Sequence, residues 1–473
     1  MRNTVIRDLV DRLGEAGVVA EATDRSRYER GYRYGDGKAL AVARPATTEE
    51  LRKVVRYCYR NDLRMVSQGA NTGLVGASTP DSSGSQIIVS LERIRGVRDL
   101  NSIDRVVSAW AGTRLSALNL ELASEGLRFS IDLAADPSLG GMVATNTGGA
   151  RLIRFGDAQR NLMGLEVVLA DAEASVFSDM SGLRKDNSGA DLKQLFVGTG
   201  GTFGIISCVQ VEVQRVPAQV AAALVVPRDH SAVPLIVERM EHECGEFLSA
   251  FEGMSRNAVA AALTHNSRLR NPFGADPLPA YCLLIELSSA LPGTVLDLGA
   301  VLTNALEKCA EDPDALIVDA RLGAIDDLWA LRHGISDGVR ALGRLIAFDI
   351  SVARSRLPRL RTQLISIVEE QFPFLRICDF GHCGDGGDHF NLVWPRGESS
   401  LPWDDARVSE IRNTVYRCVV ERHGGSFSAE HGVGPYNAHY HRQFASELEK
   451  KMTHDWKRIC DPKGLLPNAL GTR

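Results

Sequence analysis

Three glycine-rich blocks place the strongest constraint on what the first half of this chain can fold into. They are Ser67–Ser78, Asp136–Gly149 and Gly198–Gly204. The first follows a short predicted strand, and the third leads into a predicted strand over 205–213. Small residues let backbone N–H groups approach and surround an anion, as phosphate-binding loops do. The density of small residues favours phosphate binding at the first block over a purely structural turn.

Neither the first nor the third block matches a common nucleotide motif. Residues 67–78 lack the closing Gly-Lys-Ser/Thr of a Walker A loop. In the block that begins at Gly198, the third glycine of G-x-G-x-x-G is out of register, and a strand follows where a helix is required. We therefore do not expect a nicotinamide site of the Rossmann type.

A fourth glycine-rich stretch, Phe380–Asn391, carries two histidines. His382 and His389 lie in a loop between predicted strands at 375–380 and 390–394. Strand, glycine-rich loop and strand form a hairpin signal, and a hairpin brings the two ends of its loop together. The two imidazoles are then suitably placed to hold a divalent metal.

A carboxylate and a third imidazole follow in the segment 428–434, as Glu430 and His431. Two histidines and a glutamate, with a spare histidine beside them, have the composition of a catalytic metal site. Three other interpretations stay open: the loop histidines form ordinary hydrogen bonds, Glu430–His431 begins a helix, or a rival metal pair forms at His439 and His441.

Length and composition limit the classes of protein. A chain of 473 residues should hold two or three domains. Its 44% hydrophobic and 24% charged residues are typical of a soluble globular protein. The formal net charge of −5 argues against nucleic-acid or membrane-surface binding. No apolar run approaches the roughly 20 residues of a membrane span.

Localisation is expected to be cytoplasmic. The first 19 residues carry Asp8, Asp11 and Glu15 on an amphipathic pattern, unlike a secretory or transit peptide. The nine cysteines are scattered singly without C-x-x-C, which indicates reduced thiols and disfavours an iron–sulfur cluster.

Arg332 lies on the apolar face of a helix predicted over 325–342. A guanidinium on such a face is costly unless it meets an anion. It could clamp a substrate carboxylate, extend its charged end to solvent, or pair with an internal Asp such as Asp349. Residues 345–353 alternate, with Ala347, Asp349 and Ser351 on a face that could line a pocket.

Several blocks of the chain, in one order, resemble the flavin-dependent 2-hydroxy-acid dehydrogenases with a vanillyl-alcohol-oxidase-type FAD domain. The similarity is greatest to members acting on D-2-hydroxyglutarate. The matching blocks are 67–76, 165–171, 183–196, Leu328–Arg332, Gly381–His382, Ser428–Gly434 and Asp461–Gly464. The resemblance implies an α+β fold: a two-lobed FAD-binding domain over 1–216, a substrate (cap) domain carrying the metal site over 217–434, and a C-terminal helical segment over 435–473 packing on the FAD domain.

The resemblance also implies site residues. His382, His389 and Glu430 match the metal ligands of a zinc-type site, and His431 matches the catalytic base. The implied substrate-binding residues are Arg332, Ser336, Asn391 and His431. The implied FAD-binding residues are Gln68, Gly69, Ala70, Asn71, Thr72, Gly73, Ser78, Pro137, Gly140, Gly141, Ala144, Thr145, Asn146, Gly148, Gly149, Gly204, Ile205, Ile206 and Asn468. Residues 67–78 contain no histidine, so FAD should be noncovalent.

Three departures from the family pattern stand out. Gly387-Asp388 replaces Asn-Leu before His389, and Pro467 precedes Asn468 where the family has Asn-Pro. Ala347 stands where the hydroxyglutarate enzymes carry a lysine for the substrate's distal carboxylate. Removing a charged partner of a buried anion can cost several kcal/mol, which is enough to change the preferred substrate.

The expected activity is FAD-dependent oxidation of a D-2-hydroxy acid, similar to D-2-hydroxyglutarate, to the 2-oxo acid. Ala347 leaves D-lactate, glycolate or a bulkier 2-hydroxy acid as alternatives. A nonenzymatic FAD- or metal-binding subunit of a larger complex is a further alternative, and a zinc hydrolase is disfavoured because no nucleophile motif is present. Without a nicotinamide motif, we expect an electron-transfer flavoprotein or a quinone as acceptor, and a homodimer by default.

Overall fold

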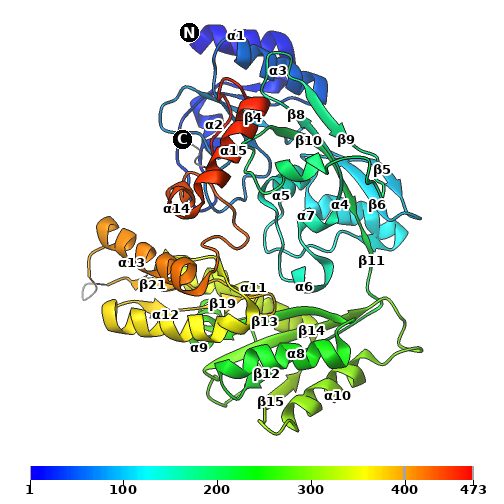
Figure 1. Cartoon of the computed structure of the whole chain (residues 1–473), viewed down its shortest axis with the longest axis vertical. Coiled ribbons are helices and arrows are strands. Elements are labelled where there is room, and N and C mark those ends of the chain that lie inside the picture. The colour runs from blue at the N-terminus through cyan, green and yellow to red at the C-terminus, as the bar shows by residue number, and fades with distance from the viewer. Residues whose placement is uncertain (1, 398–400, 471–473) are drawn as a thin grey trace. The chain divides into compact units, whose positions relative to one another are not determined.

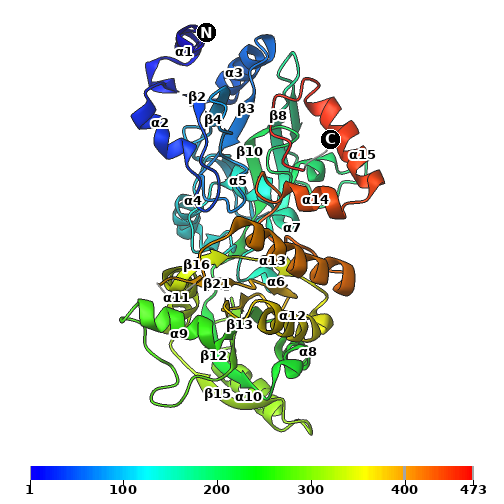
Figure 2. The ribbon, with the colours of Figure 1, turned by 90° about the vertical axis from the view of Figure 1, so that its left-hand side faces the viewer.

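The computed structural model describes residues 2–397 and 401–470. The chain forms two compact units, each described by itself below, with the elements labelled in Figures 1 and 2. The first unit comprises Met1–Gly148, Gly156–Val216 and Glu430–Arg473, and the second comprises Gly149–Phe155 and Pro217–Ala429. The chain therefore passes between the units more than once.

The first unit contains a small sheet in which β2 and β3 run parallel to β4. The strand order is β1 (Val18–Val19), β2 (Ala39–Ala43), β4 (Gln86–Ser90) and β3 (Met65–Gln68). Its helices are α1 (Arg2–Leu13), α2 (Ala22–Glu29) and α3 (Thr48–Arg60). All five residues of β2 are buried, as expected for a strand covered on both faces.

The first unit also contains a five-stranded antiparallel sheet. Its order is β5 (Val97–Asn101), β6 (Val106–Trp110), β10 (Ile205–Glu212), β8 (Leu162–Val168) and β9 (Val176–Asp179). Around it lie α4 (Leu115–Leu122), α5 (Leu139–Thr145), α7 (Ala158–Asn161) and the two-stranded pair β7 (Leu127–Arg128) and β11 (Gln214–Arg215).

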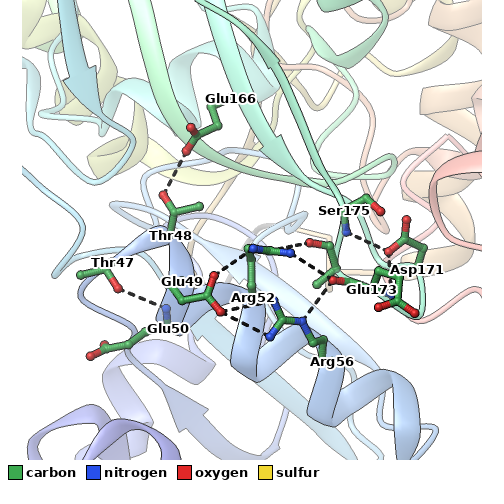
Figure 3. A network of polar contacts seen from close by, with 11 residues as sticks. Thr47, Thr48, Glu49, Glu50, Arg52, Arg56, Glu166, Asp171, Glu173 and Ser175 are labelled. Carbon is green, nitrogen blue, oxygen red and sulfur yellow. Dashed lines mark hydrogen bonds and ion pairs between the residues drawn. The ribbon is translucent and has the colours of Figure 1, made fainter.

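The helix α3 connects the two sheets through the polar network of Figure 3. The Thr48 hydroxyl donates to Glu166 of β8 at 3.0 Å. Arg52 donates to the carbonyl of Ala174 at 2.9 Å, and Arg56 to that of Glu173 at 3.1 Å. One shared hydrophobic core runs through both sheets, so the network lies at the edge of a single packed body.

The C-terminal segment returns to the first sheet. It forms α14 (Ala438–Phe444) and α15 (Glu447–Cys460), drawn in red in Figure 2. Beyond α15, the Met65 N–H of β3 donates to the carbonyl of Leu465 at 2.7 Å. Lys457 is buried, donates to the Thr202 carbonyl at 2.6 Å and pairs with Asp461 at 2.7 Å.

The second unit is built on an antiparallel sheet with helices packed against it. The strand order is β15 (Ile317–Leu322), β12 (Gln219–Pro227), β14 (Tyr281–Ser289), β13 (Leu248–Ser255) and β19 (Phe380–Gly381). The helices are α6 (Leu152–Phe155), α8 (Val233–Cys244), α9 (Arg256–His265), α10 (Leu298–Ala310) and α11 (Ile325–Leu342). Every residue of β14 is buried, so both faces of the sheet are covered.

The rest of the second unit forms two smaller sheets and two helices. One sheet has the order β16 (Gly343–Ile346), β21 (Leu392–Pro395), β18 (Arg376–Ile377), and the other pairs β17 (Ile350–Ser351) with β20 (Gly387–Asp388). The helices are α12 (Leu357–Gln371) and α13 (Asp405–Arg417), the latter followed by a single π-helical turn at Cys418–Arg422. Among residues 2–397 and 401–470, no helix is both long and apolar enough to cross a membrane.

Candidate active site

The histidine loop has the hairpin geometry that its sequence predicts. The His389 N–H donates to the Phe380 carbonyl at 2.8 Å, and the Phe380 N–H donates back at 3.3 Å. The ring centroids of His382 and His389 are 5.2 Å apart. The strand predicted over 375–380 is divided into β18 and β19, and the strand predicted over 390–394 is β21. β18 pairs antiparallel with β21, as a hairpin requires, whereas β19 joins β13.

Glu252 of β13 connects the first histidine of this loop to Arg332 of α11. Glu252 Oε1 lies 2.7 Å from His382 Nδ1. Its other oxygen accepts from Arg332 Nε at 2.7 Å and lies 2.5 Å from Nη2. The guanidinium also lies over the ring of Phe380, 4.8 Å from the centroid.

The Glu252 carboxylate is held in its charged form. Burial acts to raise its pKa, but the guanidinium of Arg332 and the imidazole of His382 outweigh burial and lower the pKa to about 2. Arg332 therefore pairs with an internal carboxylate, as one of the sequence-based alternatives held, but the partner is Glu252 of β13 and not Asp349.

Asp349 instead belongs with His389. Its Oδ1 lies 3.6 Å from His389 Nδ1, and its Oδ2 accepts from the Ala429 N–H at 3.1 Å. Glu430 and His431 follow Ala429 directly in the chain. Candidate ligand atoms of Asp349, His389, Glu430 and His431 all lie within 4.8 Å of one another. Two carboxylates and two imidazoles at this spacing can hold a divalent ion.

This group of four overlaps with the ligand set predicted from sequence without matching it. His389 and Glu430 are in both, whereas His382 is absent from the group and Asp349 is added. The rival pair His439 and His441 is not in the group either. Asp349 could have been found from its place on the alternating segment 345–353, and Glu252 from its position as a lone acid within an apolar strand.

The remaining predicted substrate-binding residues lie in the second unit. The Asn391 side chain is buried and donates to the His389 carbonyl at 3.0 Å, which stabilises the histidine loop. Ser336 is half-buried, one turn along α11 from Arg332. The Ala347 carbonyl accepts from Arg412 Nη1 at 3.0 Å.

The first glycine block is held open by its own polar side chains. The buried Gln68 amide donates to the carbonyls of Tyr28 at 2.8 Å and Ser78 at 2.7 Å. Asn71 has a left-handed backbone with a φ of 57° and accepts from the Ser78 hydroxyl at 2.9 Å. These bonds fix the backbone of the loop between Gln68 and Ser78.

The first two glycine blocks contact each other where Gly69 lies against Ser138. The space and the polar atoms at this contact indicate whether FAD would fit there. A Cβ atom on Gly69 would lie 2.1 Å from Ser138 Oγ, and one on Gly140 would lie 2.6 Å from the Ala111 Cβ. Ser138 Oγ is buried and makes no hydrogen bond within the described part of the chain. A glycine-lined cradle with an unpaired hydroxyl suits the pyrophosphate and polar groups of a dinucleotide.

The other predicted FAD-binding residues belong to the glycine blocks, to β10 or to the C-terminal segment. The third block packs on the second, because the N–H groups of Gly198 and Gly200 donate to the carbonyls of Val143 and Ala144 at 3.0 and 2.8 Å. Ile205 and Ile206 are buried in β10, whereas Asn468 is exposed. The remaining residues of the list belong to the blocks themselves.

Comparison with known families identifies both halves of the chain. Residues 39–178 match the model described as FAD binding domain, and residues 216–469 match that described as FAD linked oxidases, C-terminal domain. Mitochondrial D-2-hydroxyglutarate dehydrogenase of Bos taurus is 32% identical over 437 residues, covering 91% of this chain and 76% of the relative. That of Arabidopsis thaliana is 30% identical over 461 residues, covering 96% and 79%. D-2-hydroxyglutarate–pyruvate transhydrogenase of Saccharomyces cerevisiae is 29% identical over 443 residues, covering 91% and 86%.

Solved structures support the fold. p-Cresol methylhydroxylase superposes with a TM-score of 0.75 at 15% identity, covering 99% of this chain and 96% of that chain. Alkyldihydroxyacetonephosphate synthase gives a TM-score of 0.75 at 16% identity, covering 98% and 85%. These neighbours confirm the predicted fold of mixed helices and strands with a vanillyl-alcohol-oxidase-type FAD domain. The chain therefore belongs to the FAD-linked oxidase family, among the FAD-dependent 2-hydroxy-acid dehydrogenases.

Proposed function

We propose that this protein oxidises a D-2-hydroxy acid to the 2-oxo acid in a metal-assisted reaction with His431 as the base. The observation that carries the proposal is the group of Asp349, His389, Glu430 and His431, whose candidate ligand atoms lie within 4.8 Å of one another. The names of the relatives, D-2-hydroxyglutarate dehydrogenases and a transhydrogenase, support the class of substrate.

The glycine blocks would hold the cofactor noncovalently. Gly69, Ser138 and Gly140 would surround its pyrophosphate, since a Cβ on Gly69 would overlap Ser138 Oγ and one on Gly140 would overlap the Cβ of Ala111. When bound, FAD supplies a hydride acceptor for the substrate C2.

The acidic and imidazole group would hold a divalent metal, which we propose to be zinc. Oxygen and nitrogen donors in this mixture suit Zn, Mn, Co or Fe. Such an ion, when bound, supplies a Lewis acid that polarises the substrate's carboxylate and hydroxyl. His389 and Glu430 would be ligands in both versions of the site. The set predicted from the sequence adds His382, whereas the group of four adds Asp349 and His431.

His431 would accept the C2 hydroxyl proton. Its Nε2 lies 3.8 Å from Glu430 Oε1, so a carboxylate stands beside the imidazolium that proton transfer would create. His431 is also one of the four candidate ligands, which gives it two distinguishable roles. If His431 is only the base, its replacement leaves the metal bound. If His431 is a ligand, its replacement releases the metal.

The test is His431→Ala, purified with FAD and analysed for metal content. The proposal predicts that turnover falls by roughly 10²–10⁴-fold, while flavin and metal occupancy stay at wild-type levels. Near-normal turnover would remove His431 from the base role, and loss of metal would make it a ligand. Exhaustive chelation should abolish activity, and added Zn²⁺ should restore it.

We propose an external electron acceptor, either a flavoprotein or a quinone. The yeast relative is named as a transhydrogenase with pyruvate, which makes a 2-oxo acid the competing acceptor. A panel of a quinone analogue, a flavoprotein-directed dye and pyruvate, scored by reoxidation of bleached flavin, separates these classes.

A further inference from the structure

We propose that the ion pair between Glu252 and Arg332 positions the histidine loop and leaves Arg332 without an uncompensated charge to bind a substrate carboxylate. The site therefore prefers 2-hydroxy acids with a single carboxylate. The substrate half of this inference rests on the proposed function, whereas the positioning half concerns only contacts among described side chains. Glu252 and Arg332 act as positioning residues, because neither needs to touch the substrate.

The Arg332 charge is already compensated inside the second unit. Arg332 Nε and Nη2 lie 2.7 and 2.5 Å from the same oxygen of Glu252. The Glu252 side chain is 1% exposed and that of Arg332 is 9% exposed, so water screens their attraction only weakly. A second carboxylate near Arg332 would therefore meet a neutral pair in place of an isolated cation.

The same carboxylate fixes the orientation of His382. With Glu252 Oε1 at 2.7 Å from Nδ1, the favoured tautomer carries its proton on Nδ1 and leaves Nε2 with a lone pair. A carboxylate that accepts from one ring nitrogen and directs the other toward a metal is the usual partner of a ligating histidine. Arg332 balances the charge of that carboxylate and stacks on Phe380, the residue that closes the histidine hairpin.

The side chain at position 347 provides no replacement cation. Ala347 is half-buried and offers only a methyl group on the face that it shares with Asp349. The buried guanidinium beside it, Arg412, donates to the Ala347 backbone carbonyl at 3.0 Å and lies over the ring of Phe348. The nearby Asp349 is itself an anion in the candidate metal group. A substrate tail that reaches this region meets a methyl group and a compensated ion pair, which suits an aliphatic tail such as that of D-lactate or a longer monocarboxylic 2-hydroxy acid.

Two variants test the inference. Glu252→Gln keeps the side-chain volume but removes the charge that orients His382. We expect the affinity of the FAD-loaded protein for Zn²⁺, measured by chelator competition, to fall by roughly 10–100-fold. Arg332→Met should lower kcat/KM for D-lactate and D-2-hydroxyglutarate by the same factor, because Arg332 affects both substrates only by positioning the histidine loop.

A matched control is available on the adjacent strand. Glu286 of β14 is also buried and ion-paired with an arginine, Arg151, but touches no predicted ligand. Glu286→Gln should leave Zn²⁺ affinity at the wild-type value in protein that retains FAD. Equal Zn²⁺ affinities for Glu252→Gln and Glu286→Gln would overturn the positioning half.

The substrate half fails separately. A wild-type kcat/KM that favours D-2-hydroxyglutarate over D-lactate, together with a loss confined to the diacid in Arg332→Met, would restore Arg332 as a substrate clamp. If wild-type protein bleaches with no hydroxy acid, the proposed function fails, whereas the Zn²⁺ comparison still decides the role of Glu252. If Glu252→Gln does not fold, an unchanged Zn²⁺ affinity in Arg332→Met contradicts the positioning half.

Discussion

Arg151 and Glu286 form a two-point ion pair between segments that are distant in sequence. Arg151 Nε lies 2.8 Å from Oε1 and Nη2 lies 2.7 Å from Oε2. Trp329 Nε1 donates to the same carboxylate at 2.6 Å, and the guanidinium lies 4.7 Å from the centroid of the Trp329 ring. The pair anchors residues 149–155, which directly follow the second glycine block, within the second unit.

Replacing Arg151 by Ala should destabilise the second unit strongly. Glu286 would remain buried without its cation, and breaking a buried pair in this way costs about 3–5 kcal/mol. Urea unfolding followed by far-UV circular dichroism measures the change. Arg270→Ala, which removes an exposed pair with Asp327, is the control and should leave the midpoint unchanged. Equal midpoints for the two variants would contradict the assignment.

Gly69→Ala should weaken FAD binding with little loss of fold. The added Cβ would lie 2.1 Å from Ser138 Oγ, so the Ser138 hydroxyl must turn away from its position beside the first glycine block. The ratio of absorbance near 450 nm to that at 280 nm reports flavin content. Gly189→Ala is the matched control, since a Cβ there meets nothing within 4 Å. Full flavin content in Gly69→Ala would place the cofactor elsewhere.

His230 should make the protein sensitive to mild acid. Burial and the nearby Arg361 lower its pKa to about 4 from an ordinary value of 6.5, whereas Asp379 and Asp229 act in the opposite direction. Between pH 6.5 and pH 4, His230 therefore binds a proton in the unfolded chain but not in the folded chain. Stability falls as the pH drops from 6.5 toward 4, by up to about 3 kcal/mol.

The variant His230→Phe should flatten this dependence. Both ring nitrogens are buried without hydrogen bonds in the described structure, and the ring packs edge-on against Tyr281 with centroids 4.6 Å apart. Phenylalanine keeps that packing and removes the titration. Thermal midpoints between pH 4 and 7 provide the measurement. His242→Phe, on an exposed part of α8, should retain the wild-type slope; if His230→Phe does so too, another group titrates.

Lys457→Met should detach the C-terminal segment from the first unit. Burial lowers the Lys457 pKa, although Asp461 beside it acts in the opposite direction. Without the lysine, Asp461 and the Thr202 carbonyl lose their shared cation, and we expect a loss of about 3 kcal/mol or more. Limited proteolysis should then cleave near α15 faster than in wild type. Lys463→Met, on a more exposed pair with Asp62, serves as the control.

Much of the fold could be predicted from short-range pattern. The helix predicted over 325–342 is α11 to the residue, and the predicted strand 205–213 is β10 within one position. Strong periodicity and adjoining glycines were sufficient there. The helix near the C-terminus was also predicted, and its Trp456 packs against the core, but Leu448, Met452 and Ile459 are more than 60% exposed and do not mark a buried face.

The site was harder to predict because its partners are remote in sequence. The hairpin signal placed His382 and His389 together, which the ring distance of 5.2 Å confirms. Nothing local indicates that Glu252 reaches Arg332, since that contact depends on the order of strands in a five-stranded sheet. A lone buried acid in an apolar strand signals that a partner exists without identifying it.

The hydrogen bond from Met65 to Leu465 has a consequence for biosynthesis. The first sheet gains a contact from residues that are synthesised after the entire second unit. The second unit can therefore collapse on its own while the first still lacks the segment that carries α15. Stable capture of flavin should then follow synthesis of the second unit, and nascent chains stalled before α15 should fail to retain it.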